Sequence, residues 1–287
     1  MAAHKKRAVP GRIHTPKGRE KKKGVSSFNV PPQTDSSING LEIDNLEKFI
    51  RFIEGETNME CVLFRGQNAD WPLLPKLSRV KIRSDKAVIT ERKMLEDFKR
   101  LAKAHITRVP SNDWEWLAMA QHHGMATRLL DWTSNPLAAL WFAVSQPASD
   151  AYGVVYVLFV HEKSFLRPEE LSKLDPFKET ATKVFRPEIS TIRIQCQSGW
   201  FTTQELDKRT GNWVPFNKTS SFSKDIIQIK IPARCFSGIR FQLDKLGINM
   251  FSLFQDLDGT AAYAEWSHTM LKDEEAKDER LSKGRKL

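Results

Sequence analysis

The sequence predicts an α+β fold in which helices dominate the first part of the folded region and strands the second. Residues 85–105 and 113–122 carry apolar side chains at helical spacing, whereas residues 153–160, 192–197 and 225–231 show the short apolar or alternating runs of strands. Because helices and strands segregate in this way, a repeating βαβ arrangement is not expected. Hydrophobic residues make up 40% and aromatic residues 10% of the chain, which is enough to build a core and excludes wholesale disorder.

The charge of the chain is concentrated at its N-terminus. Residues 1–24 contain nine Lys or Arg and a single acid, Glu20, so they carry +8 of the formal +10. The last twenty residues hold six basic and five acidic side chains, which leaves the middle of the chain nearly neutral. Without apolar periodicity, residues 1–40 cannot offset the entropy lost on ordering. We therefore expect a disordered basic tail over 1–40, one folded domain over 41–266 and a charged C-terminal tail over 267–287.

The cysteines and the lack of a long apolar segment indicate the compartment. Cys61, Cys196 and Cys235 are far apart and form no C-x-x-C pair, which argues against a disulfide framework and against a structural zinc site. The N-terminus lacks the apolar core of a signal peptide, and no stretch approaches the ~18 apolar residues of a membrane span. We therefore expect a soluble, cytoplasmic protein that binds neither a membrane nor a metal ion.

Local signals define the expected elements of the first half. Asp44 is the expected N-cap of the first helix, because Glu47 follows three residues later. Residues 61–64 are expected to form a short strand that leaves the core at a tight turn at Arg65 and Gly66. The residues expected to point inward are Leu46, Phe49, Ile50 and Ile53 in the first helix, and Val88, Met94 or Leu95, Phe98 and Leu101 in the helix over 85–105.

Caps and helix breakers define the later elements. The helix over 113–122 is expected to stop at Gly124, and Asn135 with Pro136 has the N-cap and N1 chemistry of a helix that runs to Val144. Residues 153–160 are apolar enough for a strand that is buried on both faces. The chain is then expected to form a strand closed by Pro232, a helix over 234–246 ended by Gly247, a turn at 256–259 and a short last helix.

Several familiar catalytic signatures are missing. The chain contains no G-x-x-x-x-G-K-[ST], no G-x-G-x-x-G after a strand, no H-E-x-x-H and no G-x-S-x-G. Kinases, Rossmann oxidoreductases, zincins and α/β-hydrolases are therefore poorly supported. His122 and His123 are adjacent, so they point in different directions from one helix and cannot chelate one metal as an i, i+4 pair would. A structural or hydrogen-bonding role suits this pair better.

Three segments are unusually polar for a protein core. Residues 64–67 (FRGQ) place a charge and a glycine at a strand end, and residues 121–136 hold many donors, acceptors and aromatics between two apolar helices. Residues 193–201 put two amides on one face of an expected strand. Burying so many polar groups is costly unless they satisfy one another or a ligand, so the composition predicts a polar cleft. Arg65 either serves that cleft or pairs with a surface carboxylate.

The same segments resemble the FRG domain family. Similarity to its motifs is carried by residues 64–67, by residues 116–136 (WLAMAQHHGMATRLLDWTSNP), and by the later segments 193–201 (RIQCQSGWF) and 253–259 (LFQDLDG), in the right order. The chain departs from the residues usual in the family at Ala126, Cys196 and Gln255. The departures at Ala126 and Gln255, where proline is usual, relax the rigidity of two turns.

The FRG motifs in turn resemble ADP-ribosyltransferases of the Arg-Ser-Glu class. This resemblance implies an ADP-ribosyltransferase-like split β-core with helices packed around it, and NAD as a substrate. In that class an arginine holds the NAD diphosphate, a Ser-Thr-Ser strand precedes a helix with small residues, and a glutamate on a later strand is catalytic. The resemblance assigns these places to Arg65, to residues 132–134 (WTS) and to residues 195–197 (QCQ). The third place lacks the glutamate.

These roles are chemically coherent. Cleavage of the nicotinamide–ribose bond passes through an oxocarbenium-like state, so a site must anchor the diphosphate and stabilise positive charge. A guanidinium binds phosphate oxygens bidentately, which suits Arg65. Gln197 can hydrogen-bond a ribose hydroxyl but cannot take a proton, so either Asp131 takes that part or the domain binds a nucleotide without efficient turnover. The expected catalytic residues are Arg65, Ser134, Gln197 and Asp131, and the expected NAD-binding residues are Arg65, Gly66, Gln121, His122, Thr127, Arg128 and Thr133.

The polar site residues are expected to converge on one pocket, and two neighbours have structural alternatives. Arg128 either adds a second cation to the pocket or forms a buried ion pair with Asp131 that bridges helix to strand. Trp132 either stacks on a base or packs in the core. Convergence also requires Arg65 and Gln197 to lie on the same side of the sheet.

Two functional interpretations follow. The first is an enzyme, an NAD-dependent ADP-ribosyltransferase or NAD-consuming effector, and the resemblance implies a setting in bacterial or phage defence or in a toxin system. The alternative is a non-catalytic module that binds a nucleotide or nucleic acid through the same cleft. The basic N-terminal tail is either a solvated segment or a segment that binds nucleic acid or an acidic protein in a salt-sensitive, sequence-independent way.

Overall fold

The computed structural model describes residues 40–56, 61–84, 86–178, 181–187, 195–204, 206–207 and 209–275. All of them fall in the unit that spans Pro32–Leu287. The expected basic tail, apart from Gly40, lies outside the described residues, as does the end of the chain after Glu275.

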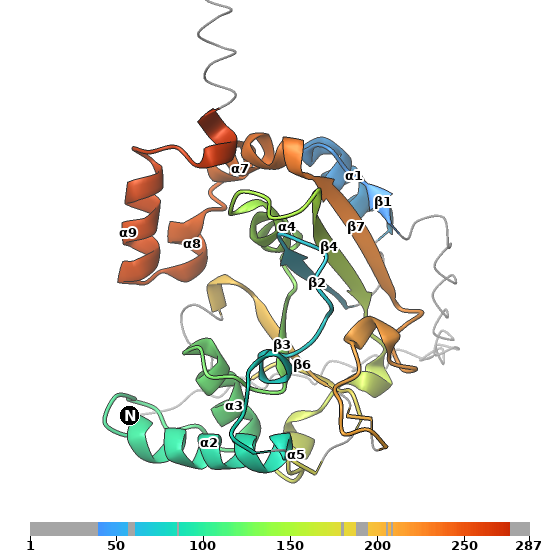
Figure 1. Ribbon diagram of the computed structural model, residues 1–287, viewed down its shortest axis with the longest axis vertical. Helices are drawn as coiled ribbons and strands as arrows, with labels where there is room; N and C mark the ends of the chain where they lie inside the picture. Colours follow the sequence, from blue (N-terminus) through green and yellow to red (C-terminus); the bar gives the residue numbers. More distant parts are fainter. Residues whose placement is uncertain are drawn as a thin grey trace, which may run out of the picture. The chain divides into compact units, whose positions relative to one another are not determined.

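The fold is mixed α/β and is built on a seven-stranded sheet of order β1-β7-β4-β2-β3-β6-β5 (Figure 1). β1 and β7 are parallel, and every other neighbouring pair is antiparallel. The strands that the sequence predicts from Cys61, Gly153 and Asp225 all lie in this sheet, as expected. The first of them continues through Arg65 and Gly66 to Gln67, so the tight turn expected at Arg65 and Gly66 is wrong. The strands are β1 (Leu41–Glu42), β2 (Val62–Gln67), β3 (Leu129–Thr133), β4 (Tyr152–Phe159), β5 (Val184–Phe185), β6 (Gly199–Thr203) and β7 (Ile226–Pro232).

The strand expected over residues 192–197 is wrong in its described part. Gln195 and Cys196 are helical, and the strand β6 begins only at Gly199. Between them Ser198 adopts a left-handed conformation with φ of 49°, and its N–H donates to the carbonyl of Gln195 at 2.9 Å. A strand cannot run through such a turn, and alternation in the sequence does not reveal it. Residues 192–194 lie outside the described residues.

The helices begin and end close to the predicted caps. In α4 the Asn135 side chain accepts from the N–H groups of Leu137 and Ala138 at 3.0 and 3.2 Å, with Pro136 at the first position. The principal helices are α1 (Leu46–Glu56), α2 (Ala87–Ala102), α3 (Asp113–His122), α4 (Pro136–Val144), α5 (Pro168–Leu171), α7 (Phe236–Lys245), α8 (Met250–Phe254) and α9 (Leu257–Trp266). Short 3-10 turns are η1 (Lys76–Arg79), η2 (Glu162–Ser164), η3 (Phe216–Lys218) and η4 (Ala233–Cys235).

Some details of the helices differ from the sequence-based expectation. Asn45, rather than Asp44, caps α1, because its side chain accepts from the N–H of Lys48 at 2.9 Å. In α1 Ile50 is exposed, and in α2 Leu101 is 61% exposed, although both were expected to face the core. The buried face of α2 instead includes Glu91, which pairs with Arg128.

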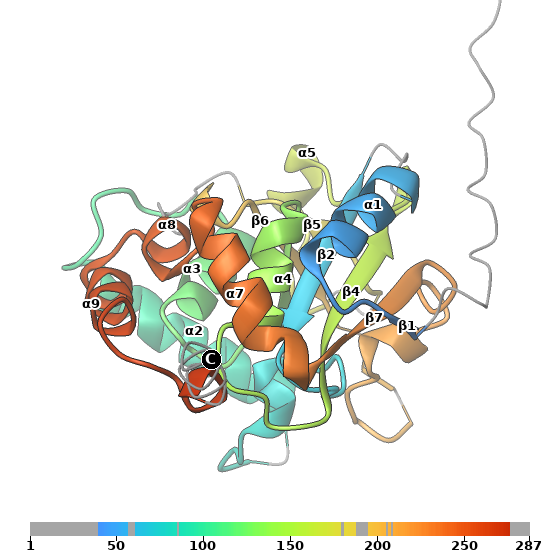
Figure 2. The same ribbon diagram turned by 90° about the horizontal axis from the view of Figure 1, so that it is seen from above.

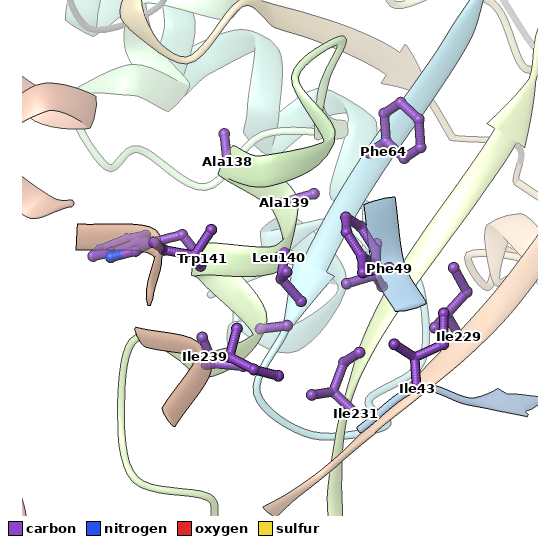
Figure 3. Close-up of a cluster of buried hydrophobic side chains, with 14 of the residues drawn as sticks. Ile43, Phe49, Phe64, Ala138, Ala139, Leu140, Trp141, Ile229, Ile231 and Ile239 are labelled. Atoms are coloured by element: carbon purple, nitrogen blue, oxygen red, sulfur yellow. The ribbon is translucent and has the colours of Figure 1, made fainter. Parts of the chain in front are cut away.

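Two layers of side chains enclose the middle of the sheet. Helices α1, α4 and α7 pack on one face of β2, β4 and β7 (Figure 2), and Phe49, Leu140 and Ile229 meet there (Figure 3). The opposite face is covered by a second cluster that includes Trp132 and Phe216. β4 contributes side chains to both clusters, so the prediction of a strand buried on both faces is confirmed. Helices α2 and α3 form a third cluster with β3, β5 and β6.

Close approach of α4 to the sheet depends on two glycines. A Cβ atom at Gly66 would lie 1.8 Å from the carbonyl oxygen of Ala139, and one at Gly153 would lie 2.6 Å from that of Ala143. Neither separation is compatible with a side chain, because the obstructing atoms are backbone. The glycine of the FRGQ segment therefore serves the packing of α4, whose alanines complete the contact.

The packed structure continues beyond Trp266, where the sequence places the end of the domain. Arg240 of α7 is buried and donates to the carbonyl of Val144 at 2.9 Å. Its guanidinium also binds the carboxylate of Asp273 at 2.9 Å and that of the buried Glu274. Two acids of the expected charged C-terminal tail thus neutralise a buried cation.

Candidate functional site

The candidate site lies where the sheet opens between β2 and β3. All of β2 pairs with β4 and all of β3 pairs with β6, but within these described strands only Phe64 and Thr133 pair across the gap. Strands that diverge leave side chains and main-chain groups facing a common space. This opening brings together residues from distant segments, as the sequence predicts.

Two adjoining chambers occupy this region. The first, here called the aromatic chamber, encloses about 250 Å³, and the second, here called the charged chamber, encloses about 680 Å³. Both are lined by Arg65, Gln121, His122 and Asp131. The aromatic chamber is completed by Phe64, Gly66, Trp132, Thr133, Phe142, Gln197, Gly199, Trp200 and Phe201. The charged chamber is completed by Lys76, Arg79, His123, Gly124, Met125, Leu129, Leu130, Asp256 and Asp258.

Arg65 is held in a fixed orientation at the junction of the chambers. Its side chain is 18% exposed, with Nε donating to Oε1 of Gln67 at 3.2 Å and Nη1 donating to the carbonyl of Asp131 at 2.7 Å. Among the described residues Nη2 makes no hydrogen bond. Burial lowers the pKa of the guanidinium, the Asp131 carboxylate raises it, and the charge of Arg79 lowers it further. The group remains cationic, because an arginine pKa is far above neutrality.

Asp131 presents the carboxylate of the site. Its side chain is 59% exposed, and its Oδ2 lies 3.9 Å from Nη1 of Arg65. Oδ1 accepts from Nε2 of Gln121 at 2.9 Å. The buried Thr127 hydroxyl in turn donates to Oε1 of Gln121, which fixes the orientation of that amide. Thr127 lines neither chamber, so it supports the site from behind instead of binding a ligand.

Arg128 does not reach either chamber, contrary to the expectation that it adds a cation there. It is buried, and Nε donates to Oε2 of Glu91 at 2.7 Å, while Nη1 donates to the carbonyl of Pro176 at 2.6 Å. The backbone N–H of Arg128 donates to Oε1 of Glu91 at 2.6 Å. The alternative of a buried ion pair was sound, but the partner is Glu91 and not Asp131. Burial raises the pKa of Glu91, although Arg128 lowers it.

The residues at the end of β3 have different roles. Thr133 donates its hydroxyl to the carbonyl of Gln197 and accepts from the N–H of Asn135 at 2.9 Å, so it joins β3 to the turn before β6. Nε2 of Gln197 is buried and has no hydrogen-bond partner among the described residues, which leaves it available to a ligand in the aromatic chamber. Ser134 is exposed and lines neither chamber, contrary to the expectation that it is a catalytic residue of the same pocket.

Trp132 packs in the core and does not offer its face as a stacking platform. It is buried, its Nε1 donates to the hydroxyl of Thr202 at 3.0 Å, and its ring lies 5.3 Å from that of Phe216. His122 and His123 contact each other edge to face with ring centres 4.8 Å apart. Within the described part of the chain, no group of three or more His, Cys, Asp or Glu side chains could hold a metal ion.

Comparison with known proteins bears on this arrangement. Residues 60–151 match the model of the FRG domain family. The chain contains an FRG domain. The matched segment spans β2 to α4, and therefore supplies Arg65, Gln121, His122 and Asp131, which line both chambers. No curated protein and no solved structure matches the chain. None of the helices described in the structure is long and apolar enough to cross a lipid bilayer.

Four charged residues that line the charged chamber were not predicted as site residues from the sequence. Lys76, whose Nζ donates to the carbonyl of Gly124 at 2.7 Å, and Arg79 come from η1, a segment without apolar periodicity. Asp256 caps α9 by accepting from the N–H of Gly259 at 2.6 Å, and Asp258 follows it. The sequence marks the LFQDLDG segment as a turn and as one of the FRG motifs, but its proximity to Arg65 follows only from the fold.

Proposed function

We propose that the FRG domain binds NAD across the two chambers and cleaves its nicotinamide–ribose bond, passing ADP-ribose to an acceptor or to water. The observation that carries this proposal is the position of Arg65, which is oriented by two hydrogen bonds at the junction of two chambers of different character. A dinucleotide has the corresponding form, because two ring-bearing halves are joined by a diphosphate. A guanidinium with a free edge suits that central anion.

The lining of each chamber supports one half of the ligand. The aromatic chamber offers rings and the unpartnered amide of Gln197, which suit a flat nicotinamide and a ribose hydroxyl. The charged chamber is the larger, and its wall carries Lys76 and Arg79, which suit phosphate oxygens, together with Asp256 and Asp258, whose carboxylates suit the hydroxyls of the adenosine ribose. Together the chambers are within the range of ligand sites, which enclose about 300–1,000 Å³.

Asp131 is the residue that we assign to the chemical step. Its exposed carboxylate lies at the junction, where it can offset the positive charge that develops on the ribose as the bond to nicotinamide breaks. The same carboxylate can accept the proton of an attacking hydroxyl, which Gln197 cannot do. Gln121 holds the carboxylate through Oδ1, and Thr127 holds Gln121.

A non-catalytic nucleotide-binding module is the second candidate. It is favoured by the amide of Gln197, which stands where the resemblance to ADP-ribosyltransferases implies a glutamate. In that case Arg65 and Gln197 hold the ligand, and the ordered position of Asp131 serves only to orient Arg65.

Labelled NAD distinguishes these functions. The full chain is incubated with NAD labelled on the nicotinamide or on the adenine, with and without cell lysate and nucleic acid. Release of nicotinamide, or transfer of adenine label to a macromolecule, supports the enzyme, whereas binding without either supports the module. Absence of both binding and turnover contradicts the whole proposal.

Two variants assign the roles of the site residues. Arg65→Ala removes the diphosphate anchor and is expected to weaken binding of a non-cleavable NAD analogue by about 10–100-fold, since hydrogen bonds to charged groups contribute about 1.5–3 kcal/mol. Asp131→Asn is expected to retain binding and to lose turnover. Arg51→Ala, which removes an exposed arginine on α1, is the matched control and should change neither measurement.

An enzyme that cleaves NAD could act as the toxic component of a defence or toxin system. Consumption of cellular NAD would arrest growth, which is the form that a function in phage defence or in a toxin system would take. Expression of the wild-type chain is then expected to stop growth and to lower NAD, while Asp131→Asn does neither.

A further inference from the structure

A third pocket lies among helices α4, α7, α8 and α9, the last two of which run side by side (Figure 1). It encloses about 430 Å³ and shares no lining residue with either chamber of the candidate site. Its walls include the rings of Trp141, Tyr263 and Trp266 and the flexible side chains of Met250 and Met270. Such walls suit an apolar stem, because aromatic and thioether groups adapt to its shape.

The charge of this pocket is negative. Asp244 and Glu265 line it, and Arg240 is the only cation among the described residues of its wall. Arg240 is already neutralised, because its guanidinium binds both Asp273 and Glu274. The wall itself therefore carries the two carboxylates of Asp244 and Glu265, while the charge of Arg240 is offset by Asp273 and Glu274, which do not line the pocket. A local excess of negative charge attracts cations.

The two lining carboxylates remain available. Glu265 is exposed, and its carboxylate makes no hydrogen bond or ion pair among the described residues. Asp244 accepts from Nδ2 of Asn249 at 2.8 Å and raises the pKa of the neighbouring Tyr263 hydroxyl. An ionised carboxylate has about four acceptor sites, so Asp244 can take a further donor.

The rim of the pocket extends over the surface. The ring of Trp266 lies 6.1 Å from that of Tyr263 and 5.5 Å from that of Phe241, which is 44% exposed. Met270 is 55% exposed on the same wall. Exposed apolar side chains beside a pocket give the residues that flank an inserted side chain an apolar surface to pack on. A small free amine has no flanking residues and would leave this surface uncovered.

We propose that this pocket binds an arginine or lysine side chain presented by a peptide segment of a partner protein. The stem of the inserted residue packs against Tyr263 and Trp266, and its cation lies beside Asp244 and Glu265. Residues on either side of it cover Phe241 and Met270. Aromatic faces attract such cations in addition to the carboxylates.

A capped pentapeptide tests the proposal in the full-length chain. Acetyl-Gly-Leu-Arg-Leu-Gly-amide, with a dye at its N-terminus, is titrated with protein and followed by fluorescence anisotropy. A matched peptide with citrulline keeps the shape of arginine without its charge, and capped free arginine serves as the small-molecule probe. The arginine peptide is expected to bind at least tenfold more tightly than either of the other two.

Variants then locate the binding. Glu265→Gln and Tyr263→Leu are each expected to weaken the arginine peptide by about threefold, whereas Tyr263→Phe keeps the ring and most of the affinity. Glu275→Gln removes an equal charge outside the pocket and should change nothing. Equal binding of the citrulline peptide, equal binding of capped arginine, an effect of Glu275→Gln as large as that of Glu265→Gln, or no binding at about 1 mM protein would each overturn the proposal.

Discussion

Removal of the Arg128 side chain should mainly destabilise the fold, because it leaves the buried Glu91 carboxylate without its charged partner. Breaking a buried ion pair costs about 3–5 kcal/mol. In Arg128→Leu the backbone N–H of residue 128 still donates to Oε1 of Glu91, so we expect the lower end of that range, about 3 kcal/mol. For a domain of this size each kcal/mol lowers the melting temperature by about 2–4 °C, which predicts a fall of roughly 10 °C.

The pH dependence of that loss identifies its cause. Arg128 lowers the pKa of Glu91 in the folded protein, whereas burial raises it, so the variant should have a still higher folded pKa. When the pKa of a carboxyl is higher in the folded than in the unfolded protein, the free energy of unfolding is unaffected below the unfolded-state pKa of about 4.3. It then falls as the pH rises from there through the folded-state pKa. The deficit of Arg128→Leu relative to wild type should therefore be smaller at pH 5 than at pH 8.

These effects are measured by urea unfolding of the wild type, Arg128→Leu, the double variant Arg128→Leu with Glu91→Gln, and the control Arg51→Leu. Adding Glu91→Gln to Arg128→Leu should recover part of the lost stability, because a neutral amide still accepts from the backbone N–H. Arg51→Leu removes an exposed arginine that pairs with Glu47 and should change the free energy of unfolding by less than about 0.5 kcal/mol. If Arg128→Leu instead unfolded like wild type and lost nucleotide binding, the buried-pair explanation would be wrong.

Three other changes give clear outcomes. Gly66→Ala places a Cβ atom against the carbonyl of Ala139, and we expect a loss of more than about 4 kcal/mol by urea unfolding; a wild-type midpoint would contradict the close packing of α4. A chain that ends at Trp266 lacks both acids that bind Arg240, so its free energy of unfolding should be about 3–5 kcal/mol lower than that of a chain that ends at Glu275. Differential scanning calorimetry should show the difference as a lower melting temperature. Equal melting would show that the pair contributes nothing. Deletion of residues 1–35 should abolish salt-sensitive binding to DNA or RNA in a filter assay, and unchanged binding would move that activity to the folded region.

The sequence was most informative where the determinants are local. Asn135 and Pro136 define the start of α4, and Gly124, with φ of 86°, follows the end of α3, because caps act within one turn of a helix. The left-handed turn at Ser198 was missed because serine carries no strong signal for that conformation. Leu101 follows the helical spacing of its neighbours, but its exposure depends on what packs against α2.

The candidate site was predictable in part. Arg65, Gln121, Asp131 and Gln197 come together as expected, because the polar segments that carry them could not all be buried singly. Arg128 has the same polar character, but its partner lies 37 positions away on α2, and no pattern in the sequence connects them. The charged chamber depends on η1 and on the start of α9, whose approach to Arg65 is a property of the tertiary fold alone.

The sparse joining of β2 to β3 has a consequence for local unfolding. Each half of the sheet keeps its own ladder of hydrogen bonds, so one half can open without breaking those of the other. Near the line where they meet, the described contacts between the halves include the pairing of Phe64 with Thr133, the bond from Arg65 to the carbonyl of Asp131, the packing of α4 and the side chains of the second cluster. Amide protons of β2 and β4 are therefore expected to exchange with solvent as one cooperative block and those of β3 and β6 as another, with separate free energies of opening.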